Sequence, residues 1–523
     1  MKVLVSDPLS EEGIEILKKE ATVDLETNLT QEELINKIKE YDALVIRSGT
    51  KVTKEVIESG KKLKIIGRAG VGVDNIDIEA ATKRGIIVAN APEGNTISAA
   101  EHTIAMLLSM SRNIPQANTS LKNKEWNRKK FMGVEVCDKI LGVIGLGRVG
   151  SEVAKRALGL EMKVLAYDPF ISEERAKELG VKLTTVDEIC KEADYITVHT
   201  PLNKDTKDLI NDNNFKLMKK GVRIINCARG GIINEEALCR AIKNGIVEGA
   251  ALDVFVQEPP LNSPLLDFDK VVVTPHLGAS THEAQINVAV SVAKEVLNAL
   301  KGLPVKNAIN MPYVKPEAME VIKPYLSLAE KIGNLSAQLI NGNYEKIEIL
   351  YQGEISEKDT KPITIAALKG LLSRAFGASV NYVNAPMLAK ERKIKIIESK
   401  SASIGEYPSL ITFHINSDKD SKIISGTIVR KKPRIVQIDE YCIDVVPHGY
   451  MIYSLIKDHP NIIGPCCIIL GKENINIASM QVGRIKVGGD AIMILNVDNE
   501  VSDDIIEKIK KVKGIMDAKL VKV

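Results

Sequence analysis

The sequence is poor in aromatic residues, which make up 4% of its 523 residues and include a single tryptophan, Trp126. Aliphatic side chains and alanine must therefore build its hydrophobic cores. It contains no run of about 18 apolar residues, as a transmembrane helix would need. The N-terminus, MKVLVSDPLSEEG, lacks the apolar region of a signal peptide. We therefore expect a soluble cytoplasmic protein that does not bind membranes.

Cysteine is also scarce, and none of the seven cysteines forms a CxxC pair. This spacing argues against a disulfide framework and against a zinc site, so we expect reduced, mostly buried thiols and no bound metal.

The chain has little excess charge of either sign, with a formal net charge of +3. Nucleic-acid binding proteins usually carry a strongly basic face, so this balance argues against that class. Local basic clusters could still attract a small anionic substrate. At 523 residues the chain is too long for one core, and we expect three or four domains.

Short apolar strands alternate with amphipathic helices through the first 275 residues, which predicts two parallel, doubly wound α/β sheets. The pattern changes at residues 302–314, where proline and asparagine become frequent. Residues 315–449 are of mixed α/β character, and residues 450–523 fit a compact βαββαβ module. Two long helices, 96–112 and 281–300, connect the first two units.

A glycine-rich turn, GLGRVG at residues 145–150, follows the predicted strand 140–144 and opens a predicted helix. In that context GxGxxG indicates dinucleotide binding, because the backbone approaches the pyrophosphate and the helix N-terminus attracts it. Asp168 ends the next strand, where a carboxylate binds ribose hydroxyls and repels a 2′-phosphate. The sequence therefore favours NAD over NADP.

Three later strands are each followed by a residue suited to oxidation of a 2-hydroxy acid. Arg229 lies in NCARGG, Glu258 in ALDVFVQEPP and His276 in TPHLG. Imidazole can take the hydroxyl proton, a carboxylate can stabilise the imidazolium, and a guanidinium can bind the substrate carboxylate at two points. Each residue alone also fits a surface turn, but their placement after strands of one NAD-binding sheet favours a shared active site.

These motifs, together with RAGVGVDNID upstream, resemble the D-isomer-specific 2-hydroxyacid dehydrogenase family. The long C-terminal extension resembles the phosphoglycerate dehydrogenase branch of that family. The resemblance implies that His276 is the acid/base, Glu258 its partner and Arg229 the carboxylate-binding residue. It implies that Asp253 holds the nicotinamide amide. The implied NAD-binding residues are Gly145, Gly147, Arg148, Val149, Gly150, Asp168, Thr200, Cys227, Ala228, Arg229, Asp253, His276, Leu277, Gly278 and Ala279.

The resemblance further implies the substrate, 3-phospho-D-glycerate, which is oxidised to 3-phosphooxypyruvate in the first step of serine synthesis. A phosphorylated substrate needs extra cations, and family members border the substrate cleft at positions matching Arg47, Ser48, Arg68 and Gly70. Arg128 is expected to reach the active site of a neighbouring subunit in a tetramer. These arginines could equally be solvated surface charges.

The same resemblance divides the chain into four predicted domains. These are a substrate-binding domain (1–97 plus 283–308), an NAD-binding domain (98–282), an intervening domain (309–449) and an ACT-like regulatory domain (450–523). In the last, Asp458 and Asn476 would bind L-serine as a feedback inhibitor, although Pro460-Asn461 replaces the usual proline-glycine turn. A purely oligomerising module is the alternative reading of that domain.

Other readings stay open at this point. A glyoxylate or hydroxypyruvate reductase would use the same chemistry, but such enzymes usually lack the two C-terminal domains. An NAD-sensing, corepressor-like binding protein would keep the NAD motifs and catalyse nothing. The basic run 430–434 (RKKPR) could bind an anion, although an exposed hairpin is the favoured interpretation.

Overall fold

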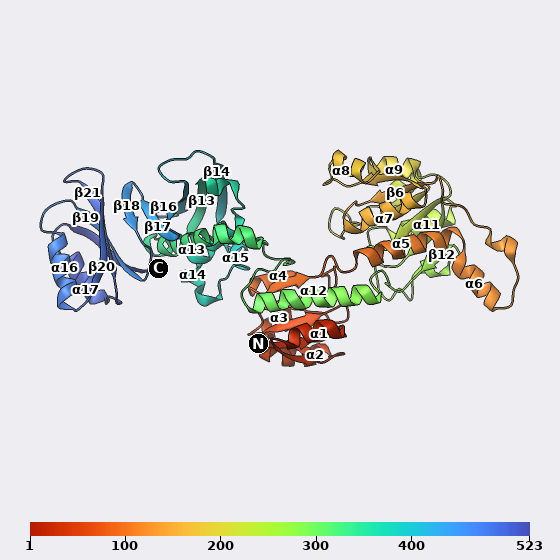
Figure 1. Cartoon of the computed structure of the whole chain (residues 1–523), viewed down its shortest axis with the longest axis horizontal. Helices are drawn as coiled ribbons and strands as arrows, with labels where there is room; N and C mark the ends of the chain where they lie inside the picture. The colour runs from red at the N-terminus through yellow and green to blue at the C-terminus, as the bar shows by residue number, and fades with distance from the viewer.

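The computed structural model describes residues 1–523, without the side chains of residues 316 and 378. Four β-sheets follow one another along the chain, each with its own helices (Figure 1). The first two sheets are parallel, the third is mixed and the fourth is antiparallel. The predicted fold class is confirmed, whereas the exact domain boundaries stay a prediction.

The first sheet has the strand order β2-β1-β3-β4-β5, and all its strands are parallel. Separate apolar cores cover its two faces, as expected for a doubly wound sheet. Its strands are β1 (Lys2–Val5), β2 (Thr22–Leu25), β3 (Ala43–Ile46), β4 (Ile65–Arg68) and β5 (Ile87–Asn90), and its helices are α1 (Glu11–Lys18), α2 (Gln31–Lys37), α3 (Lys54–Ser59) and α4 (Ile78–Lys83).

The second sheet has the order β12-β11-β10-β9-β6-β7-β8, again parallel throughout. The strand order reverses at β6, the point at which such sheets bind ligands beyond the carboxyl ends of their strands. Its strands are β6 (Ile140–Ile144), β7 (Lys163–Tyr167), β8 (Lys182–Leu183), β9 (Tyr195–Val198), β10 (Val222–Asn226), β11 (Val247–Leu252) and β12 (Val271–Val273). Its helices are α7 (Arg148–Gly159), α8 (Glu173–Glu178), α9 (Val186–Glu192), α10 (Asp212–Leu217) and α11 (Glu235–Lys243).

Two long helices connect these sheets. α5 (Thr96–Ser111) leaves the first sheet and packs on α7 and the second sheet, while α12 (His282–Leu300) returns and packs on α1 and β4. The return is tight, because a Cβ at Gly67 would lie 2.7 Å from side-chain atoms of Val292 and Val296. The two helices thereby hold the sheets so that their carboxyl ends lie next to the same pair of connections.

The third sheet packs against α13 (Pro316–Leu339), and α14 (Lys361–Phe376) packs on α13 and bonds to β13 through Thr364 and Tyr351. These helices approach backbone to backbone, since a Cβ at Gly333 would lie 2.2 Å from the Ala367 carbonyl oxygen. A shorter helix, α15 (Ala385–Glu391), follows. The strands are β13 (Tyr344–Gly353), β14 (Lys395–Ser401), β15 (Ser409–Ser417), β16 (Ser421–Val429), β17 (Lys432–Ile438) and β18 (Tyr441–Val445).

The basic run at residues 430–434 forms a hairpin, as predicted. Arg430 and Lys431 connect β16 to β17 with φ values of 49° and 63°. Two successive residues at positive φ match the right-handed twist of the strands that they join.

The fourth sheet has the order β20-β21-β19-β22, which with two helices gives the predicted βαββαβ fold. Its strands are β19 (Tyr450–Lys457), β20 (Ile477–Arg484), β21 (Asp490–Val497) and β22 (Ile515–Lys522), and its helices are α16 (Ile463–Lys472) and α17 (Asp503–Lys510). Met451, Ile494 and Val521 of this sheet belong to the same core as the third sheet. The last two units therefore share one apolar core.

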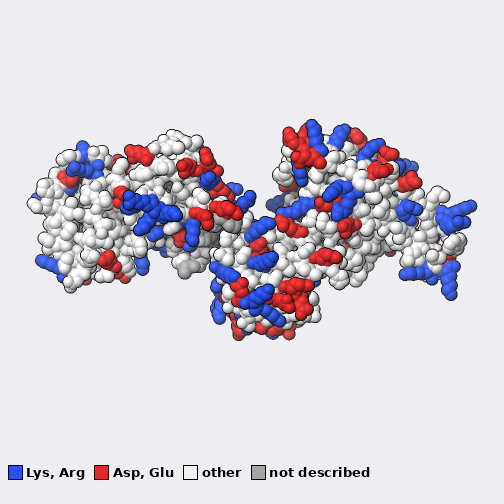
Figure 2. Space-filling model, viewed as in Figure 1, with Lys and Arg blue, Asp and Glu red and all other residues white. Residues whose placement is uncertain are grey.

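An arm that sequence patterns did not predict, α6 (Ile114–Lys122), extends away from the second sheet (Figure 1). Figure 2 shows basic side chains gathered on this arm, while acidic and basic residues intermingle over the rest of the visible face. No helix in the described chain is both long enough and apolar enough to cross a membrane.

Candidate active site

Each of the three glycines in the glycine-rich turn has a different local geometry. Gly145 has a φ of 95°, and a Cβ there would lie 2.8 Å from the His199 carbonyl group. A Cβ at Gly150 would lie 2.0 Å from the Gly145 carbonyl oxygen. A Cβ at Gly147 would meet nothing within 4 Å in the described structure. The first and third glycines therefore shape the turn, and the second leaves open space above it.

Neighbouring groups fit the adenosine and pyrophosphate of a dinucleotide. Asp168 is half-buried at the end of β7 and accepts hydrogen bonds from the backbone N–H groups of Leu146 and Phe170, each at 2.9 Å. These two bonds leave lone pairs on both carboxylate oxygens for ribose hydroxyls. The hydroxyl oxygen of Thr200, opposite the turn, is buried and has no hydrogen-bond partner in the described part of the chain. Such an unpaired group is expected where a ligand supplies the partner.

His276 and Glu258 lie together at the carboxyl edge of the same sheet. The His276 Nδ1 atom is 2.8 Å from Glu258 Oε2, and both side chains are partly exposed. Glu258 Oε1 accepts a bond from the Phe255 N–H at 3.1 Å. Because the carboxylate holds Nδ1–H, the Nε2 atom of the ring is left to accept a proton. The imidazole–carboxylate pair predicted from the sequence is present.

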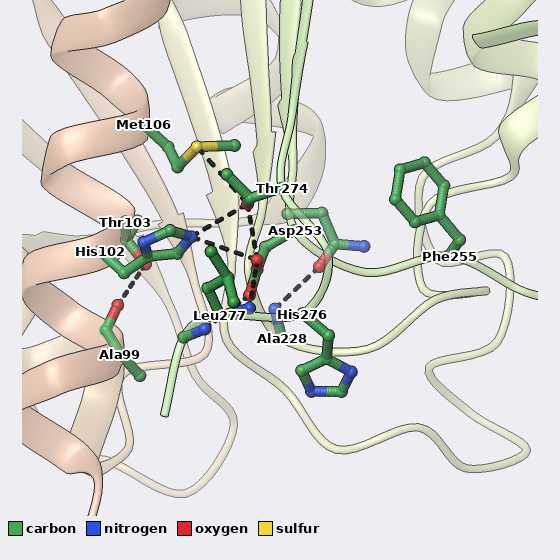
Figure 3. A network of polar contacts seen from close by, with 12 residues as sticks. Ala99, His102, Thr103, Met106, Ala228, Asp253, Phe255, Thr274, His276 and Leu277 are labelled. Carbon is green, nitrogen blue, oxygen red and sulfur yellow. Dashed lines mark hydrogen bonds and ion pairs between the residues drawn. The ribbon is translucent and has the colours of Figure 1, made fainter. Parts of the chain in front are cut away.

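Asp253 lies at the centre of a network of polar contacts next to His276 (Figure 3). It is 1% exposed and accepts hydrogen bonds from the Thr274 hydroxyl and from the N–H groups of Leu277 and Gly278, at 2.6 to 2.8 Å. His102 lies 3.2 Å from the same carboxylate. Burial alone would raise the pKa of Asp253, but these four hydrogen bonds outweigh it and hold that pKa below its ordinary value. Only Asp253 Oδ2 keeps spare acceptor capacity for a nicotinamide amide.

Arg229 projects from the loop after β10 toward the first sheet. Its Nε donates to Asp74 at 3.3 Å, and one terminal nitrogen donates to the Ala228 carbonyl at 2.7 Å. The other terminal nitrogen would lie 2.1 Å from a Cβ at position 72, so Gly72 is needed for this approach. Arg229 therefore bridges the two sheets across the cleft.

Two further arginines enter the cleft from the first sheet. Arg47 follows β3 and donates to the Pro8 carbonyl, and Arg68 ends β4 beside it, folded back over Gly70. The Arg68 Nε atom is buried without a partner in the described chain. Burial, and then the charge of Arg229, lower the pKa of Arg68 to about 10. Like charges held this close favour a bound anion.

Two further predicted arginines are exposed. Arg128 is exposed on the arm beyond α6, while Arg148 is exposed at the glycine turn. In the fourth unit, Asp458 accepts hydrogen bonds from Arg484 at 3.0 Å and from the Gly488 N–H at 3.1 Å. Asn476 donates to Asp498 at 2.7 Å. Asn461 has a φ of 64°, the conformation that the usual glycine would take in that turn.

Several residues of the site were missed in the sequence. Gly72 and Asp74 stand in the quoted segment RAGVGVDNID, and Asn226 opens NCARGG. Asn226 accepts from the Ala228 N–H and donates to the Arg229 carbonyl, which fixes that loop. An asparagine before a glycine-rich turn is a signal for such local bonding. His102 lies on an apolar helix, where spacing alone gives no functional signal.

Comparison with known proteins adds relatives that match along the whole chain. Residues 104–278 match the NAD-binding domain of D-isomer-specific 2-hydroxyacid dehydrogenases, and residues 321–439 match the intervening domain of D-3-phosphoglycerate dehydrogenases. A D-3-phosphoglycerate dehydrogenase of Synechocystis is 50% identical, over 100% of this chain and 94% of its own. One of Methanocaldococcus jannaschii is 48% identical, over 100% and 99%.

The chain belongs to the D-3-phosphoglycerate dehydrogenase family.

The NAD-binding half of this phosphoglycerate dehydrogenase family member also resembles solved structures. A D-lactate dehydrogenase of Aquifex aeolicus, complexed with NAD and lactic acid, is 31% identical with a TM-score of 0.53. The match covers 58% of this chain and 96% of the other. The chain is an NAD-dependent oxidoreductase, and its glycine turn, Asp168 and Thr200 fit that cofactor.

The glycine turn generates a prediction that separates binding from folding. Gly147→Ala should leave the melting temperature unchanged and weaken NAD binding at least tenfold, because its methyl group enters the open space. Gly150→Ala should instead lower stability by about 1–3 kcal/mol, because its methyl group meets the Gly145 carbonyl. Calorimetric NAD titration and thermal unfolding measure the two effects. Equal behaviour of both variants would contradict this division of roles.

Proposed function

We propose that the chain oxidises 3-phospho-D-glycerate to 3-phosphooxypyruvate, the first step of L-serine synthesis, with His276 as the acid/base. The observation that carries this proposal is the 2.8 Å contact of His276 Nδ1 with Glu258, on loops that follow strands of the same parallel sheet as Arg229 and the glycine turn. The family membership supports the reaction, and this geometry supports the residue roles.

In the proposed reaction, His276 Nε2 accepts the proton of the C2 hydroxyl. The Glu258 carboxylate, bonded to Nδ1–H, stabilises the imidazolium that forms. NAD held at the glycine turn and Asp168 would supply the hydride acceptor for C2. In the reverse direction the imidazolium returns its proton to the keto oxygen of 3-phosphooxypyruvate.

Arg229 is proposed to bind the substrate carboxylate. Its Nε and one terminal nitrogen are held by Asp74 and the Ala228 carbonyl, which orients the planar guanidinium in the cleft. A guanidinium oriented in this way can bind a carboxylate at two points and polarise the adjoining C2 oxygen. The bond to exposed Asp74 is weak enough to be exchanged for a substrate anion.

The phosphate is proposed to lie against Arg47 and Arg68, with Ser48 and Gly70 at the same strand ends. The unpartnered Arg68 Nε and the lowered pKa of its guanidinium both indicate a cation that lacks its anion. D-lactate and glyoxylate have no group for this position, so the cluster favours a phosphorylated acid over the reductase alternative. The catalytic pair argues against a corepressor-like protein that only senses NAD.

A tetramer with Arg128 of the arm reaching a neighbouring active site is part of the proposal, as is the cytoplasmic location. The exposure of the arm and its basic character are consistent with such a contact. The fourth unit is proposed to act as an ACT domain that binds L-serine at Asp458 and Asn476. A hydrogen bond from Gly488, and then one from Arg484, lower the pKa of Asp458 and keep it ionised for an ammonium group.

His276→Ala should lower kcat by roughly 10²–10⁴ while NAD binding is retained, because only proton transfer is lost. Steady-state assays of NADH formation and a separate NAD titration measure the two quantities. His282→Ala, which removes an exposed histidine at the start of α12, is the matched control and should keep full activity. Unchanged kcat in His276→Ala would remove this residue from the reaction.

Arg68→Gln should raise KM for 3-phospho-D-glycerate by roughly ten- to hundredfold, since a hydrogen bond to a charged group is lost. KM for NAD should not change. Lys64→Gln removes a cation just before the amino end of the same strand and serves as control. If the two variants had equal KM values, Arg68 would not bind the phosphate.

Titration with L-serine tests the regulatory proposal. Serine should inhibit the wild-type enzyme, and Asp458→Asn should require at least tenfold more serine for the same inhibition. Asp490→Asn, which alters the neighbouring pair with Lys457, is the control and should respond as the wild type does. A wild-type enzyme indifferent to serine would leave only the oligomerising role for this unit.

A further inference from the structure

His102, a residue of α5, contacts the loop that carries His276. Its Nε2 atom lies 3.1 Å from the Thr274 hydroxyl and 3.2 Å from Asp253 Oδ1 (Figure 3). The ring is four-fifths buried, with 19% of the side chain exposed. Residues more than 150 positions apart in the sequence are joined by these contacts.

The direction of each hydrogen bond follows from the available protons. The Thr274 hydroxyl donates to Asp253 Oδ1 at 2.6 Å, so its oxygen can only accept from His102. The carboxylate has no proton to give, because its pKa is lowered. His102 therefore carries a proton on Nε2 and donates it toward both oxygens. Asp253 Oδ1 is then saturated and fixed in direction.

Asp253 also fixes the backbone at His276 and just after it. Its oxygens accept the N–H groups of Leu277 and Gly278, while the Asp253 carbonyl accepts the His276 N–H at 2.9 Å. His276 itself has a φ of 56°, a left-handed conformation that costs a non-glycine residue roughly 1–2 kcal/mol. Such a conformation persists only where its surroundings hold it.

A second contact of α5 closes the other end of this loop. Ser98, one turn before His102, shares a hydrogen bond of 2.7 Å with Thr281, the N-cap of α12. α5 therefore forms hydrogen bonds with the first and the last residue of the segment 274–281. Because α5 and α12 are the two connections between the sheets, a movement of one sheet against the other would be transmitted to this segment.

We propose that His102 is a positioning residue, which through Asp253 and Thr274 holds the His276 loop in its left-handed conformation and links it to the interdomain helix α5. The inference rests on the proposed role of His276. It assigns to His102 an effect on proton transfer without contact with substrate.

His102→Leu removes the N–H donor and should lower kcat roughly tenfold, with KM for 3-phospho-D-glycerate and NAD nearly unchanged. His102→Gln keeps an N–H donor at similar reach and should restore most of the lost kcat. Ser111→Ala is the matched control, since it cuts bonds from the far end of α5 to the Leu107 carbonyl and the Tyr195 hydroxyl. Thermal unfolding of the holoenzyme variants is measured alongside.

A merely structural role for His102 would give a different pattern. Ser111→Ala should lower the melting temperature and leave kcat unchanged. If His102→Leu behaved in the same way, the inference would be wrong. A failure of His102→Gln to restore kcat would also overturn it. The role of His276 is tested separately. A His276→Ala enzyme with wild-type activity would contradict the proposed function, whatever the His102 variants show.

Discussion

The contact between His276 Nδ1 and Glu258 is the interaction on which the site depends. In the proposed mechanism it holds the proton on Nδ1 and leaves Nε2 as the nitrogen that accepts the substrate proton. The surrounding structure is arranged around that contact. Asp253 accepts the backbone N–H groups of His276, Leu277 and Gly278, and Glu258 accepts the Phe255 N–H. Asp253 and Phe255 both follow β11, at the carboxyl edge of the second sheet.

The second requirement is that two sheets meet at this edge. Arg229 bonds to Asp74 across the cleft, and Arg47 and Arg68 add positive charge from the opposite side. Helices α5 and α12 connect the halves and also clasp the loop of His276. Closure of such a cleft would exclude water from hydride transfer and complete the proposed anion site. The loops of the proposed anion site and of the proposed acid/base are joined to the same two helices.

Much of this was predictable from the sequence because glycine turns, strand ends and motif residues have local signatures. The predicted strands are present, and each is followed by its motif residue at the carboxyl edge of the sheet: GLGRVG, Asp168, Arg229, Glu258 and His276. Contacts between distant segments left no such signature. His102 sits on an apolar helix face, and Gly72 is required only because Arg229 arrives from another sheet. The arm α6 was missed because its burial pattern is weak; most of its residues are exposed.

The most direct test is the tautomer of His276, read from ¹⁵N chemical shifts of histidine-labelled enzyme at a pH where the ring is neutral. His276→Ala identifies the signals among the seven histidines. The account predicts a protonated Nδ1 and an unprotonated Nε2, and loss of that preference in Glu258→Ala. A ring protonated on Nε2 in the wild-type enzyme would contradict it.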